Sequence, residues 1–140
     1  MSNPGIILQK SYVEGRAIAD IEILVVNPVN FRQIILRKKV QIDTGFDSGV
    51  HIRETEAGDL AIIGVKPSLG PLKLAGNVVA SAQFCLGYLQ KIGGYSLPLP
   101  GIEITLVFQG TSPQGLLGLE AIKGWIVTFN GPAQSFKITC

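Results

Sequence analysis

The sequence predicts an all-β fold, mainly β-strands with one or two short helices, and three of its features support this. Apolar residues make up 46% of the chain and charged residues 16%, which is typical of a globular protein rather than a disordered one. The 17 glycines and 8 prolines lie mostly at the ends of apolar runs, as in chains of many short strands joined by turns. Several of those runs alternate apolar and polar residues, the pattern of a strand with one buried face.

The first predicted element is a hairpin. Residues Ile18–Val26 alternate with a period of two, and Asn27-Pro28 predicts a turn after them. The returning strand is predicted over Phe31–Ile42 and runs directly into Asp43-Thr44-Gly45. The motif therefore begins at a strand end that enters a tight loop, a place where functional sites are commonly built.

The middle of the chain mixes turn signals with two further strands. A short helix is predicted over Thr55–Leu60, with Thr55 as its cap. Prolines and glycines between Pro67 and Gly76 predict a mobile hairpin, which feeds a strand over Val78–Leu86. Residues Tyr88–Gly101 are rich in glycine and proline and predict an irregular connection, before a clear strand over Ile102–Phe108.

The last part of the chain predicts a short helix and a second hairpin. Gly115-Leu116-Leu117-Gly118 leads into a helix over Leu119–Lys123, closed by Gly124. Strands are expected over Trp125–Phe129 and Ser135–Thr139, and the Asn130-Gly131 pair between them favours a two-residue turn. With no internal repeat or linker, residues 1–140 are expected to form a single domain.

Charge and cysteine content exclude several classes of function. A net charge of +2 is too small to imply a nucleic-acid partner, and the basic run Arg37–Lys39 is interpreted as a solvated strand end. Residues Met1–Gly5 do not resemble a secretory signal, and no apolar run approaches the roughly 20 residues of a membrane helix. A cytoplasmic protein without a membrane partner is therefore expected. Cys85 and Cys140 match neither a disulfide framework nor a zinc site, and Cys85 is predicted to be a buried thiol.

Two motifs together carry a resemblance to a known family. Asp43-Thr44-Gly45 follows an apolar strand, and well downstream Leu116-Leu117-Gly118 opens a short helix. In that order and separation, the pair resembles the retropepsin-like aspartic peptidases over nearly the whole chain. The resemblance implies a closed, barrel-like acid-protease fold and a catalytic role for Asp43. It also implies that Thr44 ties two active-site loops together and that Gly45 lets the backbone pass close to the carboxylates.

The same resemblance implies supporting elements and a second subunit. Leu116, Leu117 and Gly118 would pack under the active-site loop, and a flap would have Ala75-Gly76-Asn77 at its tip. Hydrolysis by this route needs a base and an acid together, which two close aspartates provide by sharing one proton. Because the chain holds one Asp-Thr-Gly, the second Asp43 must come from another copy, in a two-fold homodimer that cleaves peptide or protein substrates. No metal or other cofactor is required.

Other interpretations stay open at this point. A noncatalytic β domain of the same fold, used for protein binding or regulation, would keep the aspartate motif as structure. A small ligand-binding barrel is a third reading, and Asp43 alone could be an ordinary turn residue. His51 is expected to be a surface or satisfied histidine, since a nucleophilic pair of Cys85 and His51 lacks the context that activates a thiol. The side chain of Phe46 and the neighbouring Asp47 are expected to give the cleft its own shape and charge.

Overall fold

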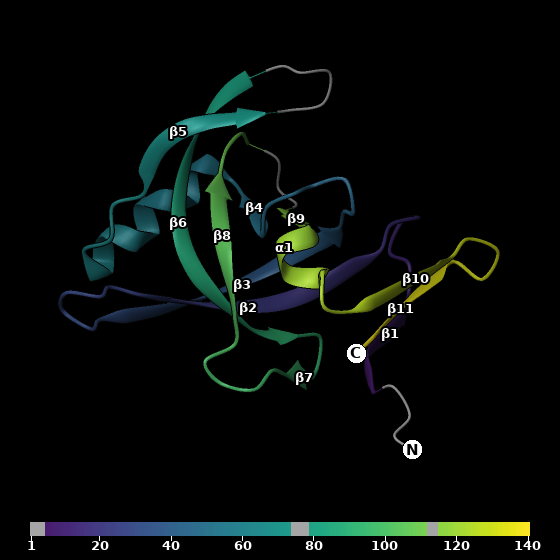
Figure 1. Ribbon diagram of the computed structural model, residues 1–140. Helices are drawn as coiled ribbons and strands as arrows, with labels where there is room; N and C mark the ends of the chain where they lie inside the picture. Colours follow the sequence, from purple (N-terminus) through teal and green to yellow (C-terminus); the bar gives the residue numbers. More distant parts are fainter. Residues whose placement is uncertain (1–4, 74–78, 112–114) are drawn as a thin grey trace.

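The computed structural model describes residues 5–73, 79–111 and 115–140 of the 140-residue chain, which consist mainly of β-strands (Figure 1). The strands are β1 (Ile6–Ser11), β2 (Ile18–Val26), β3 (Gln33–Ile42), β4 (Val50–Ile52), β5 (Ser68–Lys73), β6 (Val79–Ile92), β7 (Tyr95–Ser96), β8 (Ile102–Phe108), β9 (Gly115–Leu117), β10 (Ile126–Asn130) and β11 (Ser135–Thr139). The helices are a 3-10 helix, η1 (Glu54–Ile63), and a single α-helical turn, α1 (Leu119–Ile122). The expected flap tip, Ala75-Gly76-Asn77, lies outside the described residues and stays a prediction.

Six strands form a closed barrel in the order β2, β3, β9, β4, β8 and β6. The ring closes because β6 pairs with β8 along one part of its length and with β2 along another. Each of the six strands therefore has a paired neighbour on both of its sides over at least part of its length. The strands β5 and β7 pair with β6 outside it. The predicted all-β, barrel-like fold is confirmed.

Two of the pairings in the barrel are parallel, and they bring distant parts of the chain together. The ends of β3 and β9 run side by side, with Ile42 opposite Leu117. On its other side β9 pairs antiparallel with β4, so that Leu116 lies opposite His51. The short strand β9 therefore lies between the strand that precedes Asp43 and the strand that follows the Asp43 loop.

One hydrophobic core fills the barrel and extends under the terminal strands. Its fully buried residues include Val50, Leu106 and Leu117 from the barrel and Ile138 from β11. In β4 and β11 buried positions alternate with more exposed ones, which accounts for the period of two in the sequence. The core thus fixes which face of each strand points away from it.

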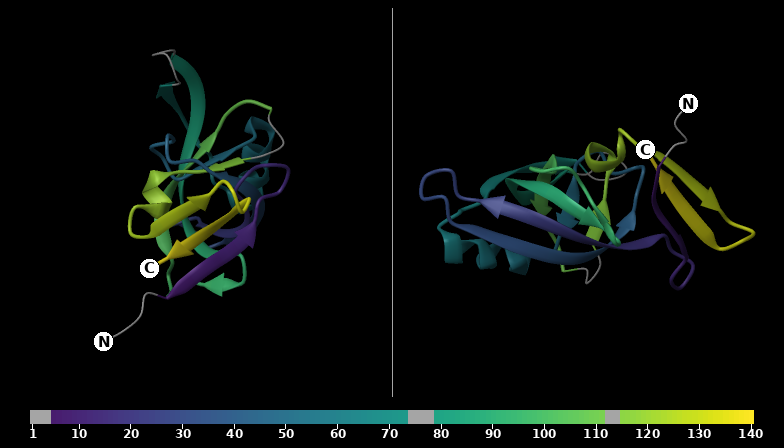
Figure 2. Two further views of the ribbon diagram at one scale, coloured as in Figure 1. Left: turned by 90° about the vertical axis from the view of Figure 1, so that its right-hand side faces the viewer. Right: turned by 90° about the horizontal axis from the view of Figure 1, so that it is seen from below.

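The two ends of the chain form a separate sheet of three strands, in the order β1, β11, β10. Strand β11 is central and pairs antiparallel with both neighbours, through partners such as Lys10 with Phe136 and Phe129 with Phe136. This terminal sheet lies at one end of the molecule, and η1 lies at the other (Figures 1 and 2). Phe136, buried in the core, anchors the sheet to the barrel.

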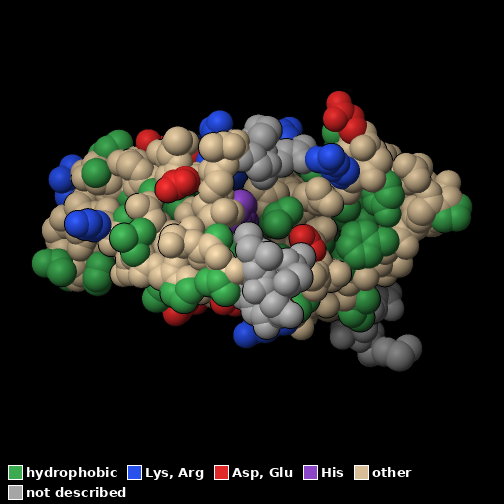
Figure 3. All heavy atoms as spheres, turned by 90° about the horizontal axis from the view of Figure 1, so that it is seen from above, with side chains coloured by type: hydrophobic (Ala, Val, Ile, Leu, Met, Phe, Trp, Pro, Cys, Tyr) green, Lys and Arg blue, Asp and Glu red, His purple; other side chains and the backbone are tan. Residues whose placement is uncertain are grey.

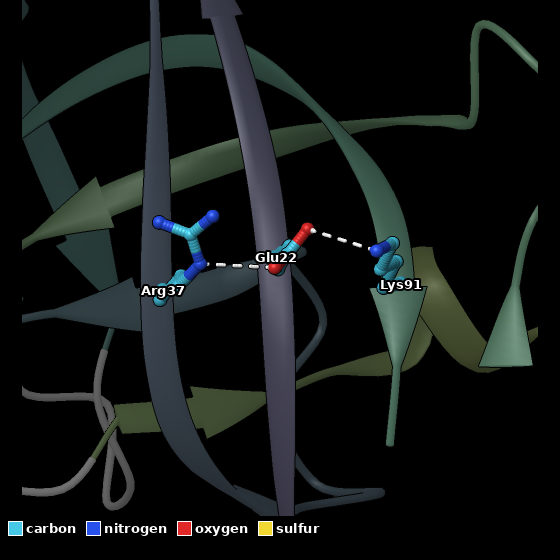
Figure 4. Close-up of polar contacts among 3 residues, drawn as sticks. All are labelled: Glu22, Arg37 and Lys91. Atoms are coloured by element: carbon cyan, nitrogen blue, oxygen red, sulfur yellow. Dashed lines mark hydrogen bonds and ion pairs between the residues drawn. The ribbon is translucent and has the colours of Figure 1, made fainter. Parts of the chain in front are cut away.

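Ion pairs cross the outer surface of the barrel between neighbouring strands. Glu22 on β2 lies opposite both Arg37 on β3 and Lys91 on β6. Its carboxylate pairs with Arg37 Nε at 2.9 Å and with Lys91 Nζ at 3.8 Å (Figure 4). Because the side chains are partly or largely exposed, such pairs contribute at most about 1 kcal/mol each.

The basic run Arg37–Lys39 was expected to be a solvated strand end, but it lies within β3, and only two of its members are solvated. Arg37 and Lys39 are largely exposed and face acidic partners on β2. Lys38 alternates to the other side, where its ammonium pairs with Glu56 of η1, and Arg53 Nε lies 3.5 Å from the same carboxylate. Burial, with a smaller contribution from the Arg53 charge, lowers the pKa of Lys38.

Most predicted elements are confirmed, with several corrections. The strand predicted over Val78–Leu86 continues to Ile92, so Tyr88–Gly101 is not wholly irregular, since β7 also falls within it. The predicted bound is wrong because Gly87 does not form a turn. A Cβ on Gly87 would lie 2.9 Å from Ile23 Cγ2, so this glycine permits close packing between strands. The prediction of a two-residue turn at Asn130-Gly131 is also wrong.

A loop of four residues, 131–134, joins β10 to β11 instead. Asn130 Oδ1 accepts a hydrogen bond from the Ala133 N–H at 3.1 Å, and Gln134 adopts a positive φ of 50°. The asparagine therefore stabilises a longer turn through its side chain. Two smaller corrections concern the helices. The helix predicted at Thr55–Leu60 is the 3-10 helix η1. The C-terminal cap of α1 is Lys123 and not Gly124.

Candidate active site

Asp43 lies directly beyond the last residue of β3, at the start of a loop that leads to β4. Its backbone N–H donates to the carbonyl of Leu117 at 2.9 Å, which continues the parallel pairing of β3 with β9 by one residue. Its carbonyl accepts a bond from the Phe46 N–H at 3.2 Å, which closes the loop into a turn. Both ends of the Asp43 backbone are therefore held, and its side chain is half-buried.

The Asp43 carboxylate is oriented by its own loop. Gly45 N–H donates to Asp43 Oδ1 at 2.9 Å. Oδ2 has no hydrogen-bond partner among the residues that the structure describes. A Cβ on Gly45 would lie 3.3 Å from Oδ1, a crowded contact that glycine avoids. One oxygen is thus held by the loop, and the other makes no hydrogen bond to a described residue.

The junction of β9 with α1 supports this loop through hydrogen bonds between backbone groups. Gly118 N–H donates to the Gly49 carbonyl at 2.8 Å, and Leu119 N–H donates to the Phe46 carbonyl at 2.8 Å. A side chain on Gly118 would overlap with the carbonyl oxygens of Phe46 and Ser48. Leu117 is fully buried, and Leu116 is half-buried. The residues predicted to lie under the Asp43 loop are therefore brought against it.

Glu120 fixes the short helix α1 to the barrel, and sequence reasoning missed it. Its carboxylate accepts hydrogen bonds from both the backbone N–H and the hydroxyl of Thr105 on β8, the latter at 3.2 Å. A helix of one turn has few hydrogen bonds of its own, so this attachment sets where α1 lies. No local signal in the sequence pairs Glu120 with a strand 15 residues earlier.

A second group of side chains, on β4 and directly after the end of β8, lies next to the loop. His51 Nε2 lies 3.0 Å from Gln109 Oε1, and the rings of His51 and Phe46 meet edge to face with centroids 6.1 Å apart. His51 and Gln109 are both half-buried. Seen from above, the histidine side chain (purple) shows at the surface, with hydrophobic and acidic side chains near it in this view (Figure 3). The expectation of a satisfied histidine is thus met through Gln109.

The alternative pairing of Cys85 with His51 is not supported by the structure. Cys85 lies opposite Leu106, which in turn lies opposite the core residue Val50, so Cys85 faces inward. His51, one residue beyond Val50, points to the other face. Burial also raises the pKa of Cys85 to about 11, which leaves little reactive thiolate at neutral pH.

The remaining predicted site residues are less constrained. Thr44 and Asp47 are exposed on the Asp43 loop, and Cys140 is exposed at the end of β11. Within residues 5–73, 79–111 and 115–140, no group of three or more His, Cys, Asp or Glu side chains gathers as metal ligands would. No helix in the same ranges is long and apolar enough to cross a membrane.

Comparison with known proteins relates this arrangement to one solved fold. No family model matches the chain, and no curated protein matches it by sequence. The crystal structure of a retropepsin-like aspartic protease from Rickettsia conorii is similar, with a TM-score of 0.59 over 99% of this chain and 96% of that one. Only 15% of the aligned residues are identical. The similarity therefore establishes a retropepsin-like fold.

Proposed function

We propose that the protein is an aspartic endopeptidase, active as a homodimer, in which the Asp43 side chains of two copies form the catalytic pair. The observation that carries the proposal is the Asp43-Thr44-Gly45 loop, held by hydrogen bonds to the Leu117-Gly118-Leu119 junction within a retropepsin-like fold. Such a loop presents a carboxylate with one oxygen held by the Gly45 N–H and the other without a partner among the described residues.

The proposed chemistry is hydrolysis by an activated water molecule. One Asp43 of the pair, ionised, takes a proton from water while the other, protonated, donates to the carbonyl oxygen of the scissile peptide bond. Two carboxylates a few ångströms apart share one proton because both cannot ionise at such a distance. This sharing is a general property of aspartic-protease pairs and is not deduced from this chain. No metal or cofactor takes part in these steps.

The second carboxylate is assigned to a second copy because none of the other aspartates of the chain lies in an Asp-Thr-Gly sequence. Asp20 pairs with Lys39 on the outer surface of the barrel, and Asp59 lies in η1. Asp47 is exposed and lacks the Thr-Gly sequence that follows Asp43. A two-fold axis beside the loop would set Asp43 against its copy, with the exposed Thr44 hydroxyls positioned to bond across the axis.

Substitution of Asp43 tests the assignment. Purified Asp43→Asn should fold as the wild type does, because the amide keeps an oxygen for the Gly45 N–H, and should lose peptide cleavage by at least 10³-fold. The pH dependence of kcat/KM in the wild type should be bell-shaped, since both the doubly protonated and doubly ionised pairs are inactive. Full activity in Asp43→Asn would refute the catalytic role of Asp43, and a folded wild type that cleaves no peptide would leave the noncatalytic domain as the better description.

A further inference from the structure

We propose that Glu120 is a positioning residue of the peptidase: its two hydrogen bonds to Thr105 set where the Asp43 loop lies, and so where the catalytic carboxylate is held. The inference rests on the proposed function and adds to it a residue that acts through its neighbours. It is carried by the hydrogen bonds that lead from the Glu120 carboxylate through the start of α1 to the backbone of the loop.

Three consecutive backbone N–H groups at the start of α1 hold the Asp43 loop. They belong to residues 118–120 and donate to three carbonyl oxygens of the loop at 2.8–3.3 Å. One of these bonds runs from Leu119 to the Phe46 carbonyl at 2.8 Å, and the Phe46 N–H in turn donates to the Asp43 carbonyl at 3.2 Å. A displacement of residues 118–120 is therefore passed to Phe46, and from Phe46 to Asp43.

The short helix α1 needs attachment to the barrel to keep these N–H groups in place. It has four residues, and a helix of a single turn is unstable without tertiary contacts. On the side of β9, the Leu117 carbonyl accepts a bond from the Asp43 N–H at 2.9 Å. On the side of β8, which lies beside α1 (Figure 1), the Glu120 carboxylate accepts from the Thr105 N–H and from its hydroxyl, the latter at 3.2 Å. Glu120 thus supplies the attachment to β8.

At Thr105 the Glu120 carboxylate takes the place of a neighbouring strand. The pairing of β4 with β8 begins with Val50 opposite Leu106, one residue beyond Thr105. The half-buried backbone N–H of Thr105 needs an acceptor, and Glu120 Oε1 provides it. Gly49, the last residue of the loop before β4, lies against the same point, since a Cβ on it would be 2.7 Å from the Thr105 carbonyl oxygen. The loop, α1 and β8 therefore meet at Thr105.

Substitutions of Glu120 and Thr105 separate these hydrogen bonds from charge and from general stability. In Glu120→Gln the amide oxygen can accept from the Thr105 N–H and the amide nitrogen can donate to the Thr105 hydroxyl, so both contacts are kept without the charge. Glu120→Ala removes both contacts. Thr105→Val removes the hydroxyl and leaves the bond from the backbone N–H. Glu103→Ala is the matched control, because Glu103 is an exposed carboxylate on the same strand as Thr105.

Steady-state cleavage of one peptide is the first test. In Glu120→Ala, kcat should fall at least about tenfold because a small displacement of a reacting group is costly, while KM stays within about twofold because contacts to the rest of the substrate are unchanged. Thr105→Val should lose a smaller factor in kcat, and Glu120→Gln and the control should keep the wild-type value. An unchanged kcat in Glu120→Ala, or in Thr105→Val where Glu120→Ala does not fold, overturns the proposal. A Glu120→Gln variant as slow as Glu120→Ala also overturns it.

Amide hydrogen exchange decides the question separately from catalysis. In Glu120→Ala the N–H groups of Phe46 and Leu119 should exchange at least about tenfold faster relative to those of β11, the central strand of the terminal sheet, because α1 and the loop open locally. Glu120→Gln and the control should keep the wild-type ratio. If the wild type cleaves no peptide but this selective change occurs, the peptidase function is wrong and the attachment of the loop by Glu120 stands. Equal changes in all these amides, or none, refute the positioning role even in an active enzyme.

Discussion

Substitution of Gly118 by alanine tests the support of the Asp43 loop most sharply. A Cβ at this position would lie closer than 3.0 Å to the carbonyl oxygens of Phe46 and Ser48, nearer than a Cβ approaches such atoms in real proteins. Both oxygens are backbone atoms of the loop itself. A flexible side chain cannot relieve such an overlap, so either the loop or the β9–α1 junction must move. Overpacking against backbone costs about 1–3 kcal/mol, and we take ~2 kcal/mol.

The expected result can be measured by thermal unfolding. For a domain of this size, ~2 kcal/mol corresponds to a fall in Tm of about 7 °C. Displacement of the Phe46 carbonyl also moves the loop that holds Asp43, so kcat should fall by at least about tenfold, because small errors of position are costly in catalysis. Gly124→Ala is the matched control, because a Cβ there meets nothing within 4 Å. Equal Tm and kcat in Gly118→Ala and the control would refute the argument.

Two further predictions follow from the titrating groups. Cys85, with a pKa of about 11 against an ordinary value of 9.0, should react with iodoacetamide at least roughly 100-fold more slowly than exposed Cys140, as measured by mass spectrometry. Labelling of both at equal rates would contradict its burial. The pKa of Lys38 is lowered in the folded protein, so its charged form opposes folding at neutral pH, and this penalty is relieved as pH rises through the folded pKa towards 10.5. The stability of the wild type relative to Lys38→Met should therefore increase as the pH is raised towards 10.5 in urea titrations, and a constant or falling difference would refute this.

Strands with a long alternating pattern could be predicted from the sequence alone. The bounds of β2 match the predicted strand, and β8 is also reproduced, because each has enough residues for burial on one face to leave a clear period of two. The three-residue strands β4 and β9 are too short to carry that signal. Their pairings depend on partners far away in the chain, such as Val50 with Leu106.

Glycine gave misleading local signals because its role depends on what surrounds it. From the sequence, Gly87 was taken as the end of a strand. It lies within β6, where Ile23 and Leu106 leave no room for a side chain. Gly118 reads as part of a motif, and its packing against the Asp43 loop explains why a glycine is needed there. Local sequence does not distinguish these two uses from a turn, since each depends on a segment distant in sequence.

The candidate site was predictable where a motif marked it and not elsewhere. Asp43, Thr44 and Gly45 stand out as a tripeptide after an apolar strand, and the structure places them at the end of β3. Glu120 and Gln109 carry no such signal. Their partners, Thr105 and His51, are brought to them only by the folding of the barrel. The catalytic role of Asp43 stays a prediction.

Mixing of subunits tests most directly whether two Asp43 side chains from two copies form one active site. Wild type and Asp43→Asn are combined at constant total concentration, left to exchange, and assayed for cleavage of one peptide. If both carboxylates are needed, activity follows the square of the wild-type fraction, so an equal mixture retains about one quarter of the wild-type rate. A rate that falls in proportion to the wild-type fraction, to about one half, would mean that each chain works alone.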